Sequence, residues 1–243
     1  MVENGENFNE VSKLIEVKRF SNKEEFYEAA LNLIVDLINK TLKKRNTFTL
    51  VLAGGRTPVP LYDRLSKCEL PWDRMHLFWG DERFLPQNED GNNFRVAYEV
   101  FISKIKIPSE NIHRIKTEFS SAEACALNYE NELLKFFGTV PEFDLTLLGM
   151  GEDGHTASIF PKSPIIKESK RLVVPTPPHG DPKVPRITLT LKAINNSKNI
   201  IFLISGENKR KLFERIIKNP EEYSQEYPAS LVKGKEKTIW FVN

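Results

Sequence analysis

A long amphipathic helix is the clearest element that the pattern of apolar residues predicts. Its apolar stripe repeats every four residues and consists of Phe26, Ala30, Ile34, Ile38 and Leu42. Ser21 and Glu24 have the spacing of a capping box, so we expect the helix to begin there. The apolar alternation over residues 14–20 predicts a strand immediately before it.

Short apolar runs, separated by helical patterns, fill most of the remaining chain. Strands are predicted at residues 47–53, 75–79, 143–148, 186–191, 200–204 and 238–242, with a shorter apolar piece around Ile112. Helices are predicted at residues 58–66, 93–105, 122–137 and 208–217. Because parallel neighbours are joined by crossovers that are usually helices, this alternation indicates a mostly parallel sheet. The predicted fold class is therefore α/β, with helices on both faces of the sheet.

The chain has the length and composition of a folded domain. Its 243 residues fall within the range of large α/β domains and contain no low-complexity linker, so we expect one domain over residues 1–243. Residues 1–13 are predicted to form a flexible N-terminal extension, and the proline-rich stretch 175–185 a stiff surface loop. A hydrophobic share of 40% and a charged share of 28% exclude dominant disorder.

Charge and cysteine content narrow the range of partners. Lys and Arg total 35 against 33 acidic residues, a net charge of +2, which predicts neither a nucleic acid nor a membrane partner. The N-terminus has no targeting pattern and no stretch reaches membrane-spanning length, so we expect a cytoplasmic protein. Cys68 and Cys125 lack metal-ligand spacing, and we expect reduced thiols and no metal site.

Glycine and polar residues directly follow four of the predicted strands. These segments are 54–57, 80–83, 149–155 and 206–209. Ligands of open parallel sheets bind beyond the carboxyl ends of the strands. We therefore expect the four segments to surround one cleft.

Segment 54–57 has the chemistry of a phosphate site. Gly54 and Gly55 allow backbone N–H groups to approach an anion closely, and the predicted helix that follows adds its positive N-terminal end. Arg56 would supply charge, and Thr57 a hydroxyl group. The alternative is an ordinary strand-to-helix turn with an exposed arginine.

Segment 149–154 reads GMGEDG and matches the G-x-G-x-x-G pattern of dinucleotide-binding loops. However, Glu152 and Asp153 would place negative charge against a pyrophosphate. The acidic residue that such a site requires at the end of the next strand is also missing. We therefore predict that the protein uses no nucleotide cofactor.

His155 is the strongest candidate for an acid or base, because it follows a strand within a glycine-rich turn and histidine exchanges protons near neutral pH. The alternative is a histidine that is satisfied by a backbone partner. Either Asp153, two residues away, or Asp81, at another strand end, is suited to orient the ring. Taken alone, these residues predict an enzyme that acts on a small phosphorylated metabolite without a metal.

Three further basic residues stand beside strand ends or starts. They are Arg83, Arg186 and Lys209. Each either faces the predicted cleft or is a solvated surface charge.

Six motifs resemble those of one enzyme family. They are LAGGRTP (52–58), PWDRMHLFWGDERFLP (71–86), NNFR (92–95), FDLTLLGMGEDGHTASIFP (143–161), VPRITLT (184–190) and ISGENK (204–209). Together they resemble the 6-phosphogluconolactonases, which hydrolyse 6-phospho-D-glucono-1,5-lactone to 6-phospho-D-gluconate in the oxidative pentose phosphate pathway. The resemblance implies a Rossmann-like α/β fold and a hydrolase that needs no metal or cofactor.

The resemblance also implies roles for the residues around the candidate base. His155 would activate the water that attacks the lactone carbonyl carbon, and would then return the proton to the ring oxygen. Asp81 and Arg83 match the family's GDER segment, and Arg83 is suited to stabilising the charge of the tetrahedral state. Asp153 is a further catalytic candidate.

A second group of residues matches the family's phosphate site. Gly55, Arg56 and Thr57 match the loop that holds the substrate phosphate, and Gly54 adjoins it. Arg186 and Lys209 match basic residues that clamp the same group. Many members have serine at the position of Arg56, so this chain departs from the family there. Either a guanidinium contact replaces the hydroxyl contact, or Arg56 does not contact the phosphate.

Two alternative functions use the same fold. A glucosamine-6-phosphate deaminase-like isomerase would carry a glutamate where this chain has Phe160, a side chain that cannot exchange protons. A non-catalytic phosphosugar-binding sensor would lack the base or carry a DNA-binding module, whereas His155, Asp81 and Arg83 are all present. We expect a phosphosugar lactone as the small-molecule partner, and a monomer or small homo-oligomer.

Overall fold

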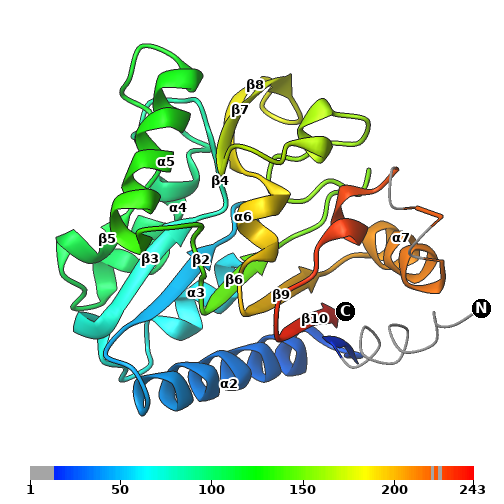
Figure 1. Cartoon of the computed structure of the whole chain (residues 1–243). Helices are drawn as coiled ribbons and strands as arrows, with labels where there is room; N and C mark the ends of the chain where they lie inside the picture. The colour runs from blue at the N-terminus through cyan, green and yellow to red at the C-terminus, as the bar shows by residue number, and fades with distance from the viewer. Residues whose placement is uncertain (1–13, 220–221, 224–225) are drawn as a thin grey trace, which may run out of the picture.

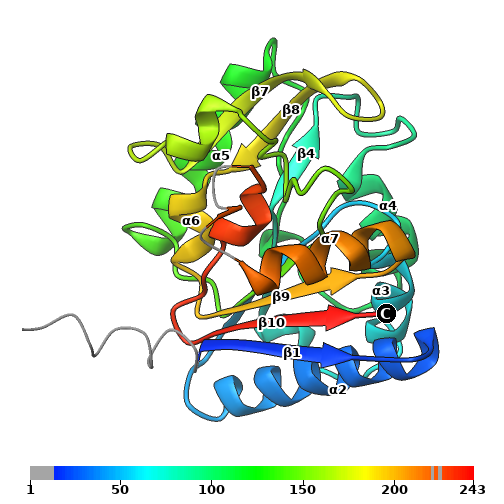
Figure 2. The ribbon, with the colours of Figure 1, turned by 90° about the vertical axis from the view of Figure 1, so that its right-hand side faces the viewer.

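The computed structural model describes residues 14–219, 222–223 and 226–243, and within these residues seven strands form a parallel sheet. Its order is β1-β10-β9-β6-β2-β3-β5, and Figure 2 shows β1, β10 and β9 side by side with their carboxyl ends together. The strands are β1 (Ile15–Arg19), β2 (Phe48–Leu52), β3 (Met75–Trp79), β5 (Ile112–His113), β6 (Leu145–Leu148), β9 (Asn199–Ile204) and β10 (Lys237–Val242). The parallel sheet predicted from the apolar runs is therefore confirmed.

Helices cover both faces of this sheet. They are α2 (Lys23–Leu42), α3 (Val59–Leu65), α4 (Asn93–Val100), α5 (Ala122–Phe137), α6 (Leu191–Asn195) and α7 (Glu207–Lys218). The chain crosses the sheet in one direction from β1 to β5 and returns through β6, β9 and β10. Right-handed crossovers therefore place α2, α3 and α4 on one face and α5, α6 and α7 on the other. In Figure 1, α2 lies below the sheet and α5 above it.

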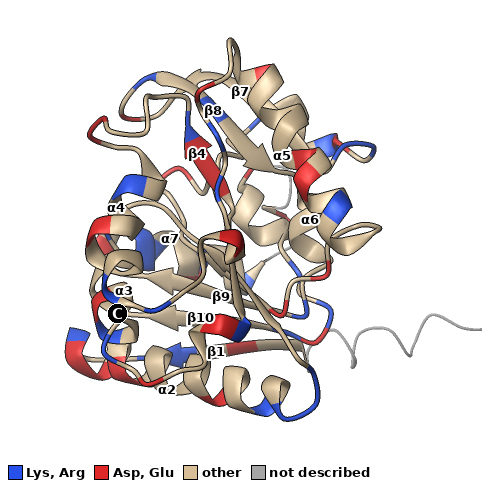
Figure 3. Ribbon diagram, turned by 90° about the vertical axis from the view of Figure 1, so that its left-hand side faces the viewer, with Lys and Arg blue, Asp and Glu red and all other residues tan. Residues whose placement is uncertain are grey.

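A second, antiparallel sheet consists of β4 (Asp81–Arg83), β8 (Val184–Leu189) and β7 (Val173–His179). Figure 3 shows acidic and basic residues next to each other on β4. The prediction of a loop over residues 175–185 is wrong, because most of this stretch forms the β7–β8 hairpin. The prolines of β7 are compatible with pairing because β7 is an edge strand. Only one side of an edge strand is hydrogen-bonded to a neighbour, so a residue without an N–H group is tolerated on the other side.

Two helix boundaries also differ from the predictions. Helix α2 begins after Asn22, whose Oδ1 accepts a hydrogen bond from the backbone N–H of Glu25 at 2.9 Å, so Ser21 is not the cap. The single helix predicted over 93–105 ends at Val100. Phe101 leaves the helical conformation, and its buried ring packs against Tyr62 and Trp72. Short 3₁₀ helices occur at Trp72–Arg74, Ile102–Lys104, Ser109–Asn111, Pro164–Lys167 and Pro228–Leu231.

The core is one continuous cluster of buried apolar residues that reaches into both sheets. Every residue of β2 and β9 is buried, as expected for central strands that helices cover on both faces. The packed sheet therefore supports the loops at its carboxyl edge. Residues 1–13, for which a flexible extension is predicted, lie outside the described residues.

Candidate active site

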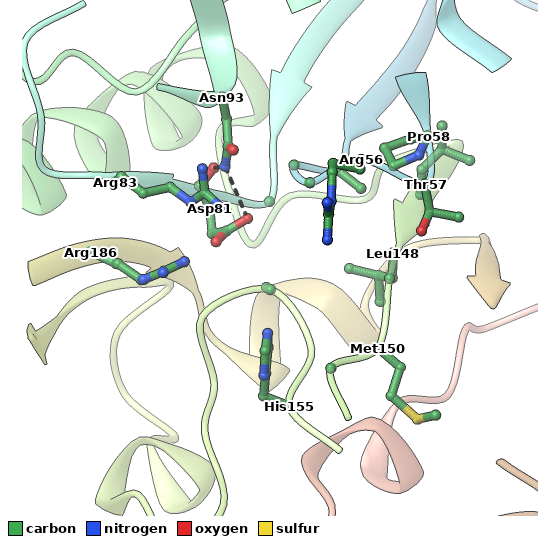
Figure 4. A pocket seen from close by; sticks show the side chains of 18 of the residues that line it. Arg56, Thr57, Pro58, Asp81, Arg83, Asn93, Leu148, Met150, His155 and Arg186 are labelled. Carbon is green, nitrogen blue, oxygen red and sulfur yellow. Dashed lines mark hydrogen bonds between the residues drawn. The ribbon is translucent and has the colours of Figure 1, made fainter. Parts of the chain in front are cut away.

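A pocket opens at the carboxyl edge of the parallel sheet, where the four predicted segments meet (Figure 4). Nine residues named from the sequence line it: Gly54, Gly55, Arg56, Thr57, Asp81, Arg83, His155, Arg186 and Lys209. Asp153 does not line the pocket but contacts His155 from behind. Segments that are far apart in the chain are thus brought together as the strand-end argument predicted.

His155 is oriented by Asp153. Its Nδ1 lies 2.6 Å from Asp153 Oδ1, and the same oxygen accepts the backbone N–H of His155 at 3.1 Å. A carboxylate only accepts, so Nδ1 carries the hydrogen and Nε2 is free to accept a proton. Figure 4 shows the ring pointing into the pocket. Burial raises the pKa of Asp153, but the hydrogen bond and charge of His155 outweigh burial and bring that pKa below its ordinary value.

The turn around His155 depends on Gly151. The backbone N–H of Gly151 donates to the carbonyl oxygen of His155 at 2.9 Å. A Cβ atom at Gly151 would lie 2.6 Å from Asp153 Oδ1 and still closer to the His155 ring. The His155–Asp153 pair therefore occupies space that only glycine leaves open at this position.

Asp81 is held by two residues that the sequence analysis did not single out. Ser158, which is fully buried, donates its hydroxyl hydrogen to Asp81 Oδ2 at 2.5 Å. Asn93 Nδ2 donates to the Asp81 carbonyl oxygen at 2.9 Å and lies 3.5 Å from Oδ1. Both residues belong to segments that matched the family, NNFR and HTASIFP, which was the only signal available in the sequence.

Arg83 and Arg186 are paired across the β4–β8 ladder. Arg186 donates from Nε to the His179 carbonyl oxygen at 3.1 Å. Burial lowers the pKa of Arg186, and the charge of Arg83 lowers it further, whereas the charge of Asp81 raises it. Arg83 donates from Nη1 to the Gly91 carbonyl oxygen, while its buried Nε has no hydrogen-bond partner among the described residues. The pair concentrates positive charge on one side of the pocket.

The glycine segment and Lys209 form a second positive region. Gly55 adopts a φ of 83°, which is open to glycine and strained for other residues. The carbonyl oxygen of Thr57 accepts the Tyr27 hydroxyl at 2.9 Å, which anchors the turn into α3. Burial lowers the pKa of Lys209, and the charge of Arg56 lowers it further, against the raising effect of Glu152. In Figure 4, Arg56 and Thr57 lie across the pocket from Arg83 and Arg186.

Two buried tyrosines hold the strand ends that precede the site. The Tyr62 hydroxyl accepts from the Ala53 N–H at 2.8 Å and donates to the Ala53 carbonyl oxygen at 2.7 Å. The Tyr129 hydroxyl likewise accepts from the Trp79 N–H at 2.9 Å and donates to the Trp79 carbonyl oxygen at 3.1 Å. Burial raises the pKa of both hydroxyls, so they stay protonated and able to donate. The peptides before Gly54 and Gly80 are therefore fixed.

Phe160 packs beside the candidate base. It is 5% exposed, and its ring centroid lies 4.7 Å from that of His155 and 4.0 Å from that of His179. The guanidinium of Arg186 lies 5.7 Å from the same ring. Phe160 therefore places an apolar surface beside His155.

No group of three or more histidine, cysteine or acidic residues suited to a metal ion occurs within 14–219, 222–223 and 226–243. Over the same residues, the helices are too short or too polar to cross a bilayer. The thiol of Cys125 is buried, and that of Cys68 is partly exposed.

Comparison with known proteins identifies the family. A model described as glucosamine-6-phosphate isomerases/6-phosphogluconolactonase matches residues 21–240. A 6-phosphogluconolactonase of Thermotoga maritima is 44% identical over 205 residues, covering 84% of this chain and 88% of the relative, and one of Synechocystis sp. is 38% identical over 226 residues, covering 91% and 92%. A crystal structure of the enzyme from Thermotoga maritima has a TM-score of 0.85 at 40% identity and covers 94% of this chain and 99% of that chain. The chain therefore belongs to the family of glucosamine-6-phosphate isomerases and 6-phosphogluconolactonases.

Proposed function

We propose that the protein hydrolyses 6-phospho-D-glucono-1,5-lactone to 6-phospho-D-gluconate, with His155 as the base that activates water. The observation that carries the mechanism is the His155–Asp153 contact of 2.6 Å at the edge of the pocket. With Nδ1 occupied by Asp153, Nε2 takes one proton from water as the oxygen attacks the carbonyl carbon. The resulting imidazolium is stabilised by the Asp153 carboxylate.

Arg83 and Asp81 act on the other side of the reacting carbon. The carbonyl oxygen becomes negatively charged in the tetrahedral state, and the guanidinium of Arg83, which lines the pocket, is suited to stabilise that charge. When the tetrahedral state collapses, the bond from the carbonyl carbon to the ring oxygen breaks, and His155 returns its proton to that oxygen. Asp81, held by Ser158 and Asn93, is a fixed acceptor for a sugar hydroxyl.

The phosphate lies at the opposite end of the pocket in this proposal. Gly54 and Gly55 offer backbone N–H groups at the start of α3, and Thr57 offers a hydroxyl. Arg56 and Lys209 line this end of the pocket and supply positive charge. The family resemblance assigned Arg186 to the phosphate clamp together with Lys209. In this proposal Arg186 instead balances negative charge at the lactone end, because it is paired with Arg83 across the β4–β8 ladder and lies across the pocket from Arg56 and Thr57 (Figure 4).

The test is acid release from freshly generated 6-phosphogluconolactone at neutral pH, with spontaneous hydrolysis subtracted. We expect rapid turnover by the wild-type protein and a loss of about 10²- to 10⁴-fold in His155→Ala, the usual contribution of general acid–base catalysis. His76→Ala is the matched control, because His76 lies in β3 outside the pocket. Equal activity of His155→Ala and wild type would contradict the assignment of the base.

The same preparation distinguishes the alternatives. Release of ammonia from glucosamine-6-phosphate would favour the isomerase, which we do not expect because Phe160 offers no proton-exchanging group beside His155. Tight binding of 6-phosphogluconate without lactone turnover would favour a sensor. A cytoplasmic location and a monomeric or small homo-oligomeric state remain part of the proposal, and one relative, from Arabidopsis thaliana, is named as chloroplastic.

A further inference from the structure

Glu82 is a buried carboxyl group that no step of the proposed reaction uses. It is 1% exposed and lies in β4 between Asp81 and Arg83. Its Oε1 accepts the backbone N–H groups of Arg83 at 2.8 Å and of Asn93 at 2.7 Å. Its Oε2 accepts the backbone N–H of Phe94 at 2.8 Å. Both oxygens are occupied by backbone donors, so Glu82 serves the fold of the site and does not contact substrate.

These hydrogen bonds attach β4 to the first turn of α4. Asn93 and Phe94 are the first two residues of the helix. Their N–H groups have no partner within the helix and need an acceptor from outside it. The Asn92 side chain accepts the N–H of Arg95 at 3.0 Å, which leaves the two earlier groups to Glu82. Glu82 therefore determines where α4 starts relative to β4.

Asn93 connects the start of α4 to the pocket. Its side-chain nitrogen donates to the Asp81 carbonyl oxygen at 2.9 Å. The same amide packs so closely against Gly54 that a Cβ atom there would overlap it. Asn93 thus lies between the two ends of the pocket, and a shift at the start of α4 changes the position of both.

We propose that Glu82 is a positioning residue, which holds the first turn of α4 so that Asn93 sets the spacing between Asp81 and the glycine segment 54–57. The kinetic part of this proposal rests on the hydrolase function proposed above. Its structural part depends only on the contacts of Glu82 and Asn93.

Glu82→Gln tests the proposal with little change of shape. An amide nitrogen cannot accept a hydrogen bond, so at least one of the three N–H groups loses its acceptor whichever way the amide is turned. Asp144→Asn is the matched control. Asp144 is also buried and accepts the backbone N–H of Thr49 at 3.0 Å, but it lies at the amino ends of the strands, away from the pocket.

Both variants are assayed at a temperature where circular dichroism shows them fully folded. We expect kcat/KM of Glu82→Gln to fall about 10- to 100-fold, the cost of displacing site groups by up to about 1 Å. We expect Asp144→Asn to lower the melting temperature and leave kcat/KM unchanged. A fully folded Glu82→Gln variant with wild-type kcat and KM would overturn the proposal, because a merely structural role lowers stability alone.

Asn93→Ala, alone and combined with Glu82→Gln, tests whether Glu82 affects the pocket through Asn93. If Glu82 acts through Asn93, the double variant has the kcat/KM of Asn93→Ala, whereas independent effects multiply and contradict the proposal. A wild-type protein without lactonase activity would instead refute the proposed function. Crystal structures of wild type and Glu82→Gln then decide: retained contacts of Asn93 with Asp81 and Gly54 would overturn the positioning role, and displaced contacts would support it.

Discussion

Gly151→Ala is a test of how closely catalysis depends on the position of His155. The new Cβ atom would lie 2.6 Å from Asp153 Oδ1 and closer still to the His155 ring. Non-bonded heavy atoms prefer about 3.5 to 4.0 Å, so the pair has to move by roughly 1 Å. The loop cannot absorb this shift freely, because the Gly151 N–H is bonded to the His155 carbonyl oxygen at 2.9 Å.

A displacement of this size costs about 100-fold in rate, or about 2.7 kcal/mol of activation free energy. We expect kcat for the lactone to fall by this factor while 6-phosphogluconate still binds, because the glycine segment 54–57, where we propose that the phosphate binds, is unchanged. Gly138→Ala is the control. Gly138 ends α5 in the left-handed conformation, and among the residues that the structure describes nothing lies within 4 Å of its Cβ position. Alanine there therefore costs about 1 to 2 kcal/mol of stability without touching the pocket. Wild-type kcat in Gly151→Ala would refute the link between the His155–Asp153 geometry and turnover.

Three further results are expected. Asp153→Asn keeps the size of the side chain but removes its charge, and we expect kcat to fall at least about tenfold because the imidazolium of His155 loses its stabilising partner; steady-state kinetics measure this. Tyr129→Phe leaves the N–H and carbonyl groups of Trp79 without the Tyr129 hydroxyl, and we expect urea unfolding to show a loss of about 1 to 3 kcal/mol. Burial raises the pKa of Glu82 from 4.5 to about 8 despite three N–H donors, so its contribution to stability is present below pH 4.5 and is lost as the pH rises through 8. The free energy of unfolding of wild type, measured from pH 4.5 to 8, should therefore fall relative to that of Glu82→Gln, and a constant difference would contradict this.

The parallel sheet was predictable because its strands are covered on both faces. Such strands are mostly apolar, and the apolar run of β3 predicted the bounds Met75–Trp79 that the structure has. The helix α5 was predicted with equal accuracy from the helical pattern over residues 122–137, and the structure adds that Gly138 ends it in the left-handed conformation. Local pattern and tertiary burial agree in these elements.

The antiparallel sheet was not predictable in the same way. Strand β4 consists of Asp81, Glu82 and Arg83, and nothing in three charged residues indicates a strand. Strand β7 contains prolines, which usually indicate a loop. Both become strands because β8 lies between them and supplies their hydrogen bonds, which is a tertiary contact that no local pattern records.

The same distinction separates the residues of the pocket from those that hold them. His155 and Asp81 were found because a strand-end position can be read from the apolar run that precedes it. Ser158, by contrast, is 77 residues from the carboxylate that it contacts. Glu82 accepts a hydrogen bond from the backbone of α4, and every residue except proline offers such an N–H group, so the sequence does not indicate which of them it binds. A sequence specifies which donors and acceptors exist, whereas their pairing requires the assembled fold. Residues that line the pocket at strand ends can therefore be named from one sequence before residues such as Ser158 and Glu82, which hold them, and substitutions at Glu82 test this difference directly.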